Sequence, residues 1–180
     1  NRFDNGHFEH AATGWTLTNA TIDSTFSFKG DRSVKTTTVS TTASATSVIL
    51  VNSIVSSVSS NTGQADTLTI NAYMESTSSN TRGFRWQVKL VETGPGATQT
   101  KYWNHSSTSW TDTDTKNEQE VDTNNRWKSY KFDLSSYPSG NWNIFVYLYS
   151  AYQTTSTSGF TALFFDSLAL EYFNFDSNSF

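Results

Sequence analysis

The chain has 180 residues, enough for one domain with a sizeable core, and 35% of them are hydrophobic. Only 16% are charged, the formal net charge is −4, and the sequence pI is about 5.2, whereas nucleic-acid binding needs a basic surface. No apolar run has the length of a transmembrane helix, and the lack of Cys excludes disulfides and thiolate metal sites. These properties favour a neutral polar partner over nucleic acid or membrane insertion.

Short alternating runs broken by Gly-, Asn- and Ser-rich turns recur along the chain, and helical periodicity is absent. This pattern predicts an all-β sandwich. In chain order, strands are expected at 8–17, 26–39, 47–58, 67–75, 84–92, 98–105, 126–134, 141–151 and 161–173.

The remaining segments are expected to connect these strands. The acidic segment 108–125 is expected to form a long connection or an edge strand, the Ser/Thr tract 36–46 a strand continuation, and 76–80 a hairpin tip. Residues 1–174 are expected to form a single domain and 175–180 a tail or linker. Because the chain begins at Asn1 without Met, we expect a mature or excised fragment.

Several motifs occur in a fixed order along the chain. They are Asn5-Gly6-His7-Phe8-Glu9 with Gly14-Trp15, Phe28-Lys29-Gly30-Asp31 with the strand after it, Leu68 to Met74, Arg126-Trp127-Lys128-Ser129-Tyr130, and Phe165-Asp166-Ser167-Leu168. Together they resemble the CenC-like carbohydrate-binding modules of the galactose-binding-like superfamily. The resemblance implies a two-sheet antiparallel jelly-roll β-sandwich with adjacent terminal strands. It also implies a non-catalytic module that is secreted or on a cell or virion surface, often beside other domains.

The terminal strands suggest a structural calcium site. Their adjacency would bring Glu9 and Asp166 together, and a hard cation would relieve the repulsion between the two carboxylates. Carbonyl oxygens of the turn at Lys29 and Asp31 would complete the site, and the resemblance also implies calcium here. The alternative is that the carboxylates are solvated or bonded to Lys29 or Arg32. Ser167 stands where the family often has a second acidic residue.

Three strands present a polar and aromatic face opposite their apolar face. If these strands share a sheet, as the resemblance implies, they form one concave patch suited to stacking on a sugar ring and hydrogen-bonding its hydroxyls. The predicted ligand-binding residues are Asn71, Tyr73, Glu75, Arg85, Gln87, Lys89, Phe145, Tyr147 and Tyr149, with Trp103 at the rim.

Each aromatic residue in this set has an alternative assignment. The row on 141–151 can be covered by the other sheet or by a loop, and Trp103, like Tyr102 and Trp110, can be a core residue. Trp15, Trp86 and Trp127 are assigned to the core or its lid.

No catalytic residue is predicted, because no signature of a catalytic triad, P-loop or dinucleotide site occurs. The preferred function is binding of a polysaccharide or oligosaccharide. One alternative is a structural or adhesive domain of a virion, tail fibre or cell-surface protein. The other is a jelly-roll lyase or hydrolase. Its candidate residues would be Glu75 beside Tyr73, the acidic segment 112–122, or Arg85, Gln87, His105 and Tyr147.

Overall fold

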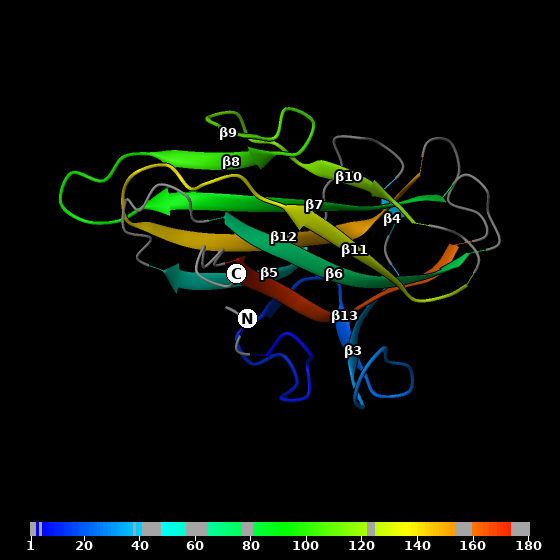
Figure 1. Cartoon of the computed structure of the whole chain (residues 1–180). Coiled ribbons are helices and arrows are strands. Elements are labelled where there is room, and N and C mark those ends of the chain that lie inside the picture. Colours follow the sequence, from blue (N-terminus) through cyan, green and yellow to red (C-terminus); the bar gives the residue numbers. More distant parts are fainter. Residues whose placement is uncertain are drawn as a thin grey trace, which may run out of the picture.

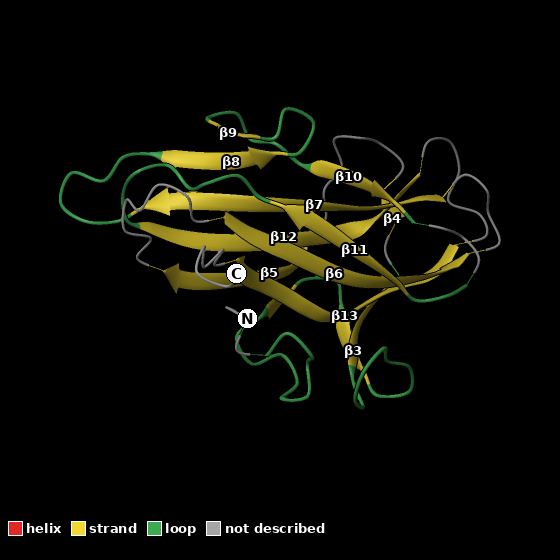
Figure 2. Ribbon diagram, in the orientation of Figure 1, coloured by secondary structure: helices red, strands yellow, loops and turns green. Residues whose placement is uncertain are grey.

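The computed structural model describes residues 3, 5–37, 39–40, 48–56, 65–76, 81–121, 125–153 and 160–173. Throughout these ranges the regular structure is strand (Figure 2). Within the same ranges no helix is long and apolar enough to cross a membrane. The predicted hairpin tip at 76–80 (except Ser76, which is in a strand), most of the tract 36–46 and the tail 175–180 lie outside the described residues.

One layer, sheet A, has the strand order β1-β5-β12-β7-β8-β9, with β10 also paired to β7 and β4 to β12 (Figure 1). Its strands are β1 (Thr16–Leu17), β4 (Val39–Ser40), β5 (Val48–Ser56), β7 (Thr81–Glu92), β8 (Thr100–Asn104), β9 (Ser109–Thr111), β10 (Asn117–Glu120) and β12 (Trp142–Gln153). The edge strand expected within 108–125 is therefore present as β10.

The second layer, sheet B, has the order β11-β6-β13-β3-β2. Its strands are β2 (Thr21–Asp23), β3 (Ser33–Thr36), β6 (Ala65–Ser76), β11 (Lys128–Asp133) and β13 (Phe160–Phe173). Pairing is antiparallel in both sheets except between β4 and β12. The prediction of an antiparallel jelly-roll sandwich is confirmed.

Period-2 alternation places one face of each long strand in the core. The inner faces of β6 and β7 are 0% exposed and consist of Leu68, Ile70, Ala72, Met74, Phe84, Trp86, Val88 and Leu90. Aromatic pairs join the two sheets: Trp86 stacks on Phe132 with centroids 4.1 Å apart, and Phe84 meets Phe165 edge-on at 5.2 Å. Burial of each such side chain contributes about 1.5–3 kcal/mol, so this interior fixes the outward direction of the alternate residues.

The opening strand predicted at 8–17 is wrong. Residues 5–14 form successive turns, and only β1 is extended. Asn5 causes this local structure, because its buried amide donates to Ala11 O and Thr13 O at 2.9 and 3.1 Å and accepts from His10 N. Side-chain bonds of this kind compete with strand pairing. The segment still lies beside β13, where Leu168 N donates to Gly6 O at 2.8 Å.

Candidate functional site

A row of three aromatic side chains lies on the outer face of β12. The ring centroids of Phe145 and Tyr147 are 6.4 Å apart and those of Tyr147 and Tyr149 are 6.2 Å apart, with interplanar angles of 26° and 15°. The rings are nearly parallel because residues two apart on a strand point to the same side. Phe145 and Tyr147 are half-buried, whereas Tyr149 is only 3% exposed. This aromatic row therefore offers its first two rings to a ligand.

The neighbouring strands extend this face with polar groups. Phe145 is in register with Lys89, Tyr147 with Gln87, and Lys89 in turn with Tyr102 of β8. Lys89 Nζ lies 5.9 Å from the Tyr102 ring centroid, within the range of a cation–π contact. The predicted grouping of β7 and β12 on one surface is thus confirmed.

Gln87 connects the aromatic row to the loop before β10. Its side chain is buried, and Nε2 donates to Asp114 Oδ1 at 2.6 Å and to Thr115 O at 2.9 Å. Tyr149 Oη donates to Gln87 Oε1 at 3.3 Å. Lys116 Nζ lies 3.7 Å from Asp114 Oδ1 and 5.9 Å from the Tyr149 ring centroid. The loop therefore covers Tyr149, as the alternative assignment required.

The phenols of this surface are held in their neutral form. Burial raises the pKa of Tyr149, and the carboxylate of Asp114 raises it further. Burial also raises the pKa of Tyr147 and of Tyr102, and the Asp114 carboxylate raises both pKa values further. Neutral phenol groups can donate and accept hydrogen bonds with sugar hydroxyls.

The side chain of Arg85 is buried and forms an ion pair with Glu118. Its Nε and Nη2 donate to Glu118 Oε1 at 3.0 and 2.7 Å, across the β7–β10 pair. Its guanidinium is 4% exposed, while Glu118 is 49% exposed. Arg85 therefore supports the edge of the sheet.

The prediction that β6 shares this sheet is wrong. Asn71, Tyr73 and Glu75 lie on β6, in sheet B, on the face opposite its apolar core residues, and Asn71 is itself only 5% exposed. Tyr73 packs against Phe26 and Trp127 with centroid distances of 4.5 and 5.8 Å. Alternation along one strand does not specify its neighbours, so the three predicted strands divide between the two outer surfaces.

The assignment of Trp103 to the rim is also wrong. It is 0% exposed on the inner side of β8, and its ring meets Trp110 edge-on at 5.3 Å. Trp15 and Trp86 are core residues, as predicted. Trp127 stacks on Phe26 outside sheet B with centroids 5.5 Å apart and an angle of 15°.

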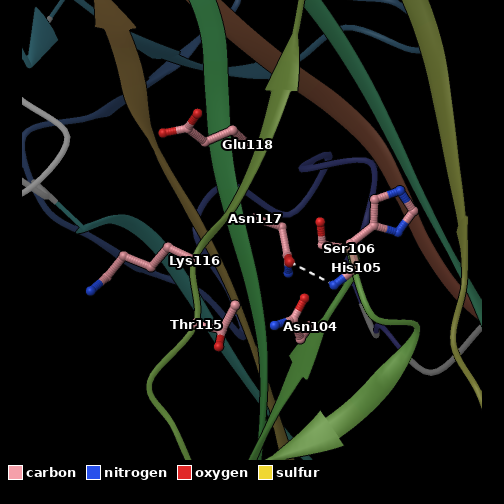
Figure 3. Close-up of a pocket in the computed structure, with 7 residues that line it drawn as sticks. All are labelled: Asn104, His105, Ser106, Thr115, Lys116, Asn117 and Glu118. Atoms are coloured by element: carbon pink, nitrogen blue, oxygen red, sulfur yellow. Dashed lines mark hydrogen bonds between the residues drawn. The ribbon is translucent and has the colours of Figure 1, made fainter.

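A pocket of about 430 Å³ lies at the edge of sheet A beside Gln87. Its lining consists of Asn104, His105, Ser106, Thr115, Lys116, Asn117 and Glu118 (Figure 3). Sequence reasoning missed most of these residues, because they come from two short strands and two loops. The one available clue was the dense polar composition of segment 104–118.

Two of the predicted calcium residues, Glu9 and Asp166, accept hydrogen bonds from backbone N–H groups of the turn formed by residues 28–32. Asp166 Oδ2 accepts from Phe28 N and Lys29 N, both at 2.8 Å. Glu9 Oε1 accepts from Asp31 N at 2.9 Å and from Arg32 N at 3.2 Å. The two carboxylates therefore occupy opposite ends of one turn.

The charge on Asp166 is poorly solvated. Its side chain is 0% exposed, and this burial raises its pKa although the N–H groups of Lys29, Phe28 and Ser167 oppose the shift. In the described part of the chain, no group of three or more His, Cys, Asp and Glu side chains is placed to hold a metal. A cation here would therefore need backbone carbonyl oxygens beside the two carboxylates, and calcium accepts both.

Ser167 has its own role at this position. A hydrogen bond of 2.9 Å joins its Oγ to His7 Nδ1, and Asn71 Nδ2 donates to its carbonyl oxygen at 2.9 Å. Its φ of 50° lies in a bulge of β13, between the register pairs of Asp166 and Ala169. The Ser167 hydroxyl thus joins the N-terminal segment to β13.

Comparison with known proteins adds similarity of fold. No protein-family model and no curated protein matches the chain, so the CenC-like assignment stays a prediction. The chain is similar to the enzymatically active domain of tailspike protein 4 from bacteriophage CBA120, with 11% identity and a TM-score of 0.57. That match covers 96% of this chain and 21% of the tailspike chain, so the chain spans about a fifth of that protein's length.

Two carbohydrate-binding modules have the same sandwich fold. The CBM22-1 xylan-binding domain of Paenibacillus barcinonensis Xyn10C is 14% identical with a TM-score of 0.53, over 93% of this chain and 91% of that one. A second module of carbohydrate-binding family 16 is 12% identical with a TM-score of 0.50, over 95% and 99%. At these identities the similarity establishes the fold alone, a two-sheet antiparallel β-sandwich.

Proposed function

We propose that this domain binds a polysaccharide, without cleaving it, on the outer face of sheet A. The observation that carries the proposal is the pair of half-buried rings of Phe145 and Tyr147 on the outer face of β12, with Lys89 in register beside Phe145. Two nearly parallel rings offer apolar surface to the C–H faces of sugars, and the Lys89 ammonium and the Tyr147 hydroxyl can hydrogen-bond sugar hydroxyls. Two structures of similar fold are carbohydrate-binding modules, which is consistent with a role in a secreted or surface protein.

The non-catalytic assignment rests on the pKa values, contacts and positions of the candidate catalytic groups. A tyrosine base needs a lowered pKa, whereas burial raises that of Tyr147. Arg85 and Glu118 bind each other, and Glu75 lies on the other sheet. His105 directs its ring to Trp86 and Phe132, at 5.8 and 5.4 Å, and so packs at the core edge.

The substitution Tyr147→Ala tests the binding surface. It should lower glycan affinity about tenfold or more, ~1.4 kcal/mol, because a central ring is lost. Affinity electrophoresis against xylan, glucan and mannan measures this, with a product assay on the same samples. Phe28→Ala is the matched control, since Phe28 is 48% exposed and packs on Trp127 outside sheet B. Equal loss in both variants, or wild-type binding to no glycan, would contradict the proposal, and product formation would make the protein an enzyme.

We also propose a structural calcium held by Glu9, Asp166 and carbonyl oxygens of the turn at Lys29 and Asp31. Burial of the Asp166 carboxylate, which raises its pKa, supports it, and the backbone of this turn lies beside both carboxylates, to which it now donates N–H groups. When bound, the cation would neutralise this charge and join the N-terminal segment to β13. A higher thermal unfolding temperature with calcium is the expected result.

A further inference from the structure

The edge pocket forms because β8 and β10 pair with different parts of the same side of β7. β8 pairs with Lys89 to Val91, and β10 pairs with Gly83 to Trp86. Gln87 and Val88 therefore fall between the two partner strands. The gap leaves a notch in the edge of sheet A.

The side chain of Asn117 connects the two strands on either side of the notch. Its Nδ2 donates to Trp103 O at 3.0 Å, and its Oδ1 accepts from His105 N at 2.8 Å. The side chain is buried, so this amide bridges the ends of β8 and β10 in place of a ladder. The dashed line in Figure 3 marks the bond to His105. The pocket is thus formed by the fold.

The chemistry of the pocket suits a neutral, hydroxyl-rich group. Amide, hydroxyl, ammonium and carboxylate groups line it, and its volume of about 430 Å³ falls within the usual range of about 300–1,000 Å³ for small-molecule sites. Its charges are balanced, because Lys116 lies 3.7 Å from Asp114, and Glu118 binds Arg85. In Figure 3, Lys116 and Glu118 extend to one side of the pocket and the His105 ring to the other.

The pocket lies sideways from the aromatic row. Tyr147 is in register with Gln87, and Gln87 binds Thr115, which lines the pocket. The path from β12 over β7 to the notch crosses two strand spacings, about 10 Å. Gln87 is buried beneath the loop at Asp114 and Thr115, so a side branch of a glycan lying along β12 would pass over this loop to reach the notch.

We infer that the edge pocket is a subsite for a neutral single-sugar branch, so that the domain recognises a decorated polysaccharide. This inference rests on the proposed glycan-binding function of sheet A. Hydrogen bonds to one sugar should raise affinity for a decorated chain about fivefold over its bare backbone.

The test compares backbones with and without branches. The probes are three pairs: linear xylan with arabinoxylan, mannan with galactomannan, and linear glucan with xyloglucan. The variant Ser106→Phe fills the pocket, and Ser107→Phe is its control on the same turn, since Ser107 does not line the pocket. Both residues are exposed, and thermal unfolding confirms that each variant is folded.

For at least one pair, wild type and Ser107→Phe should prefer the branched member about fivefold. Ser106→Phe should bind both members with the affinity of the bare backbone, whereas Tyr147→Ala should weaken both. Equal affinity of wild type for both members of every pair would overturn the branch subsite and leave the proposed function standing. Unchanged preference in Ser106→Phe, or tighter binding to a glucuronate-branched xylan than to arabinoxylan, would also overturn it. Binding to no glycan would overturn the proposed function itself.

Discussion

At the residue scale, burial of the Tyr149 hydroxyl determines its protonation state and its hydrogen-bond partner. Tyr149 is covered by the loop before β10, and its hydroxyl donates to Gln87. Burial raises the pKa of this phenol, and the Asp114 carboxylate acts in the same direction. The Tyr149 phenol therefore stays protonated at physiological pH and can donate to Gln87.

The raised pKa of Tyr149 predicts a loss of stability in alkali. An unfolded tyrosine ionises near pH 10, below the folded-state pKa. Above about pH 10 the unfolded chain binds fewer protons than the folded one, so stability falls as the pH rises. Tyr149→Phe removes this contribution, and its melting temperature should fall less steeply between about pH 9 and 11.

Thermal scans followed by circular dichroism measure this slope. Phe145→Leu is the control, because it changes the same row without a titratable group. A variant Tyr149→Phe whose slope equals that of wild type would show that Tyr149 is not protected in solution.

At the element scale, the turn at residues 28–32 joins the two ends of the described chain. Its N–H groups bind Glu9 from the N-terminal segment and Asp166 from β13. Phe28 begins the turn and Phe26 lies just before it. Both rings pack on Trp127, which precedes β11. The aromatic residues outside sheet B therefore position a carboxylate-binding turn.

Gly30→Ala tests the fit of this turn. Gly30 has φ +78°, and an added Cβ would lie 2.3 Å from Glu9 Oε1. Gly96→Ala is the matched control, because Gly96 has φ +79° with no atom within 4 Å of the added Cβ. In both variants the free energy of unfolding should fall by about 1–2 kcal/mol, because alanine is strained in the left-handed backbone conformation.

Gly30→Ala should lose more than Gly96→Ala, since the Glu9 carboxylate must also move. The free energy of unfolding in urea measures the difference. Equal losses in the two variants would show that the Glu9 contact contributes nothing to stability.

At the scale of the whole molecule, the proposed calcium would link the first residues to the last strand. Because burial raises the pKa of Asp166, the stability gained from its protonation is lost as the pH rises through the folded-state pKa. At neutral pH the buried charged carboxylate is then stabilised by the N–H groups of Phe28, Lys29 and Ser167, and a bound cation would stabilise it further. Calcium should therefore stabilise the protein more at neutral pH than in mild acid.

We expect saturating calcium to raise the melting temperature at neutral pH, relative to chelator, and to raise it less as the solution is made more acidic and Asp166 is protonated. At 100 times the dissociation constant the stabilisation would be ~2.7 kcal/mol. The variant Asp166→Asn should lose the calcium response, while Asp114→Asn, on the other sheet's surface, should keep it. A wild-type melting temperature unaffected by calcium at pH 7 would rule out the structural ion.

The sequence by itself determined the faces of the long strands, because alternation with period 2 follows from backbone geometry. It placed Phe145, Tyr147 and Tyr149 on one side of β12, and it indicated the sandwich and the meeting of Glu9, Lys29, Asp31 and Asp166.

Only the tertiary structure decided which strands share a sheet, because one strand's alternation contains no information about its neighbours. That decision separated Tyr73 from Tyr147 and buried Trp103. It also created the edge pocket, which exists because two short strands divide one side of β7 and Asn117 bridges their ends.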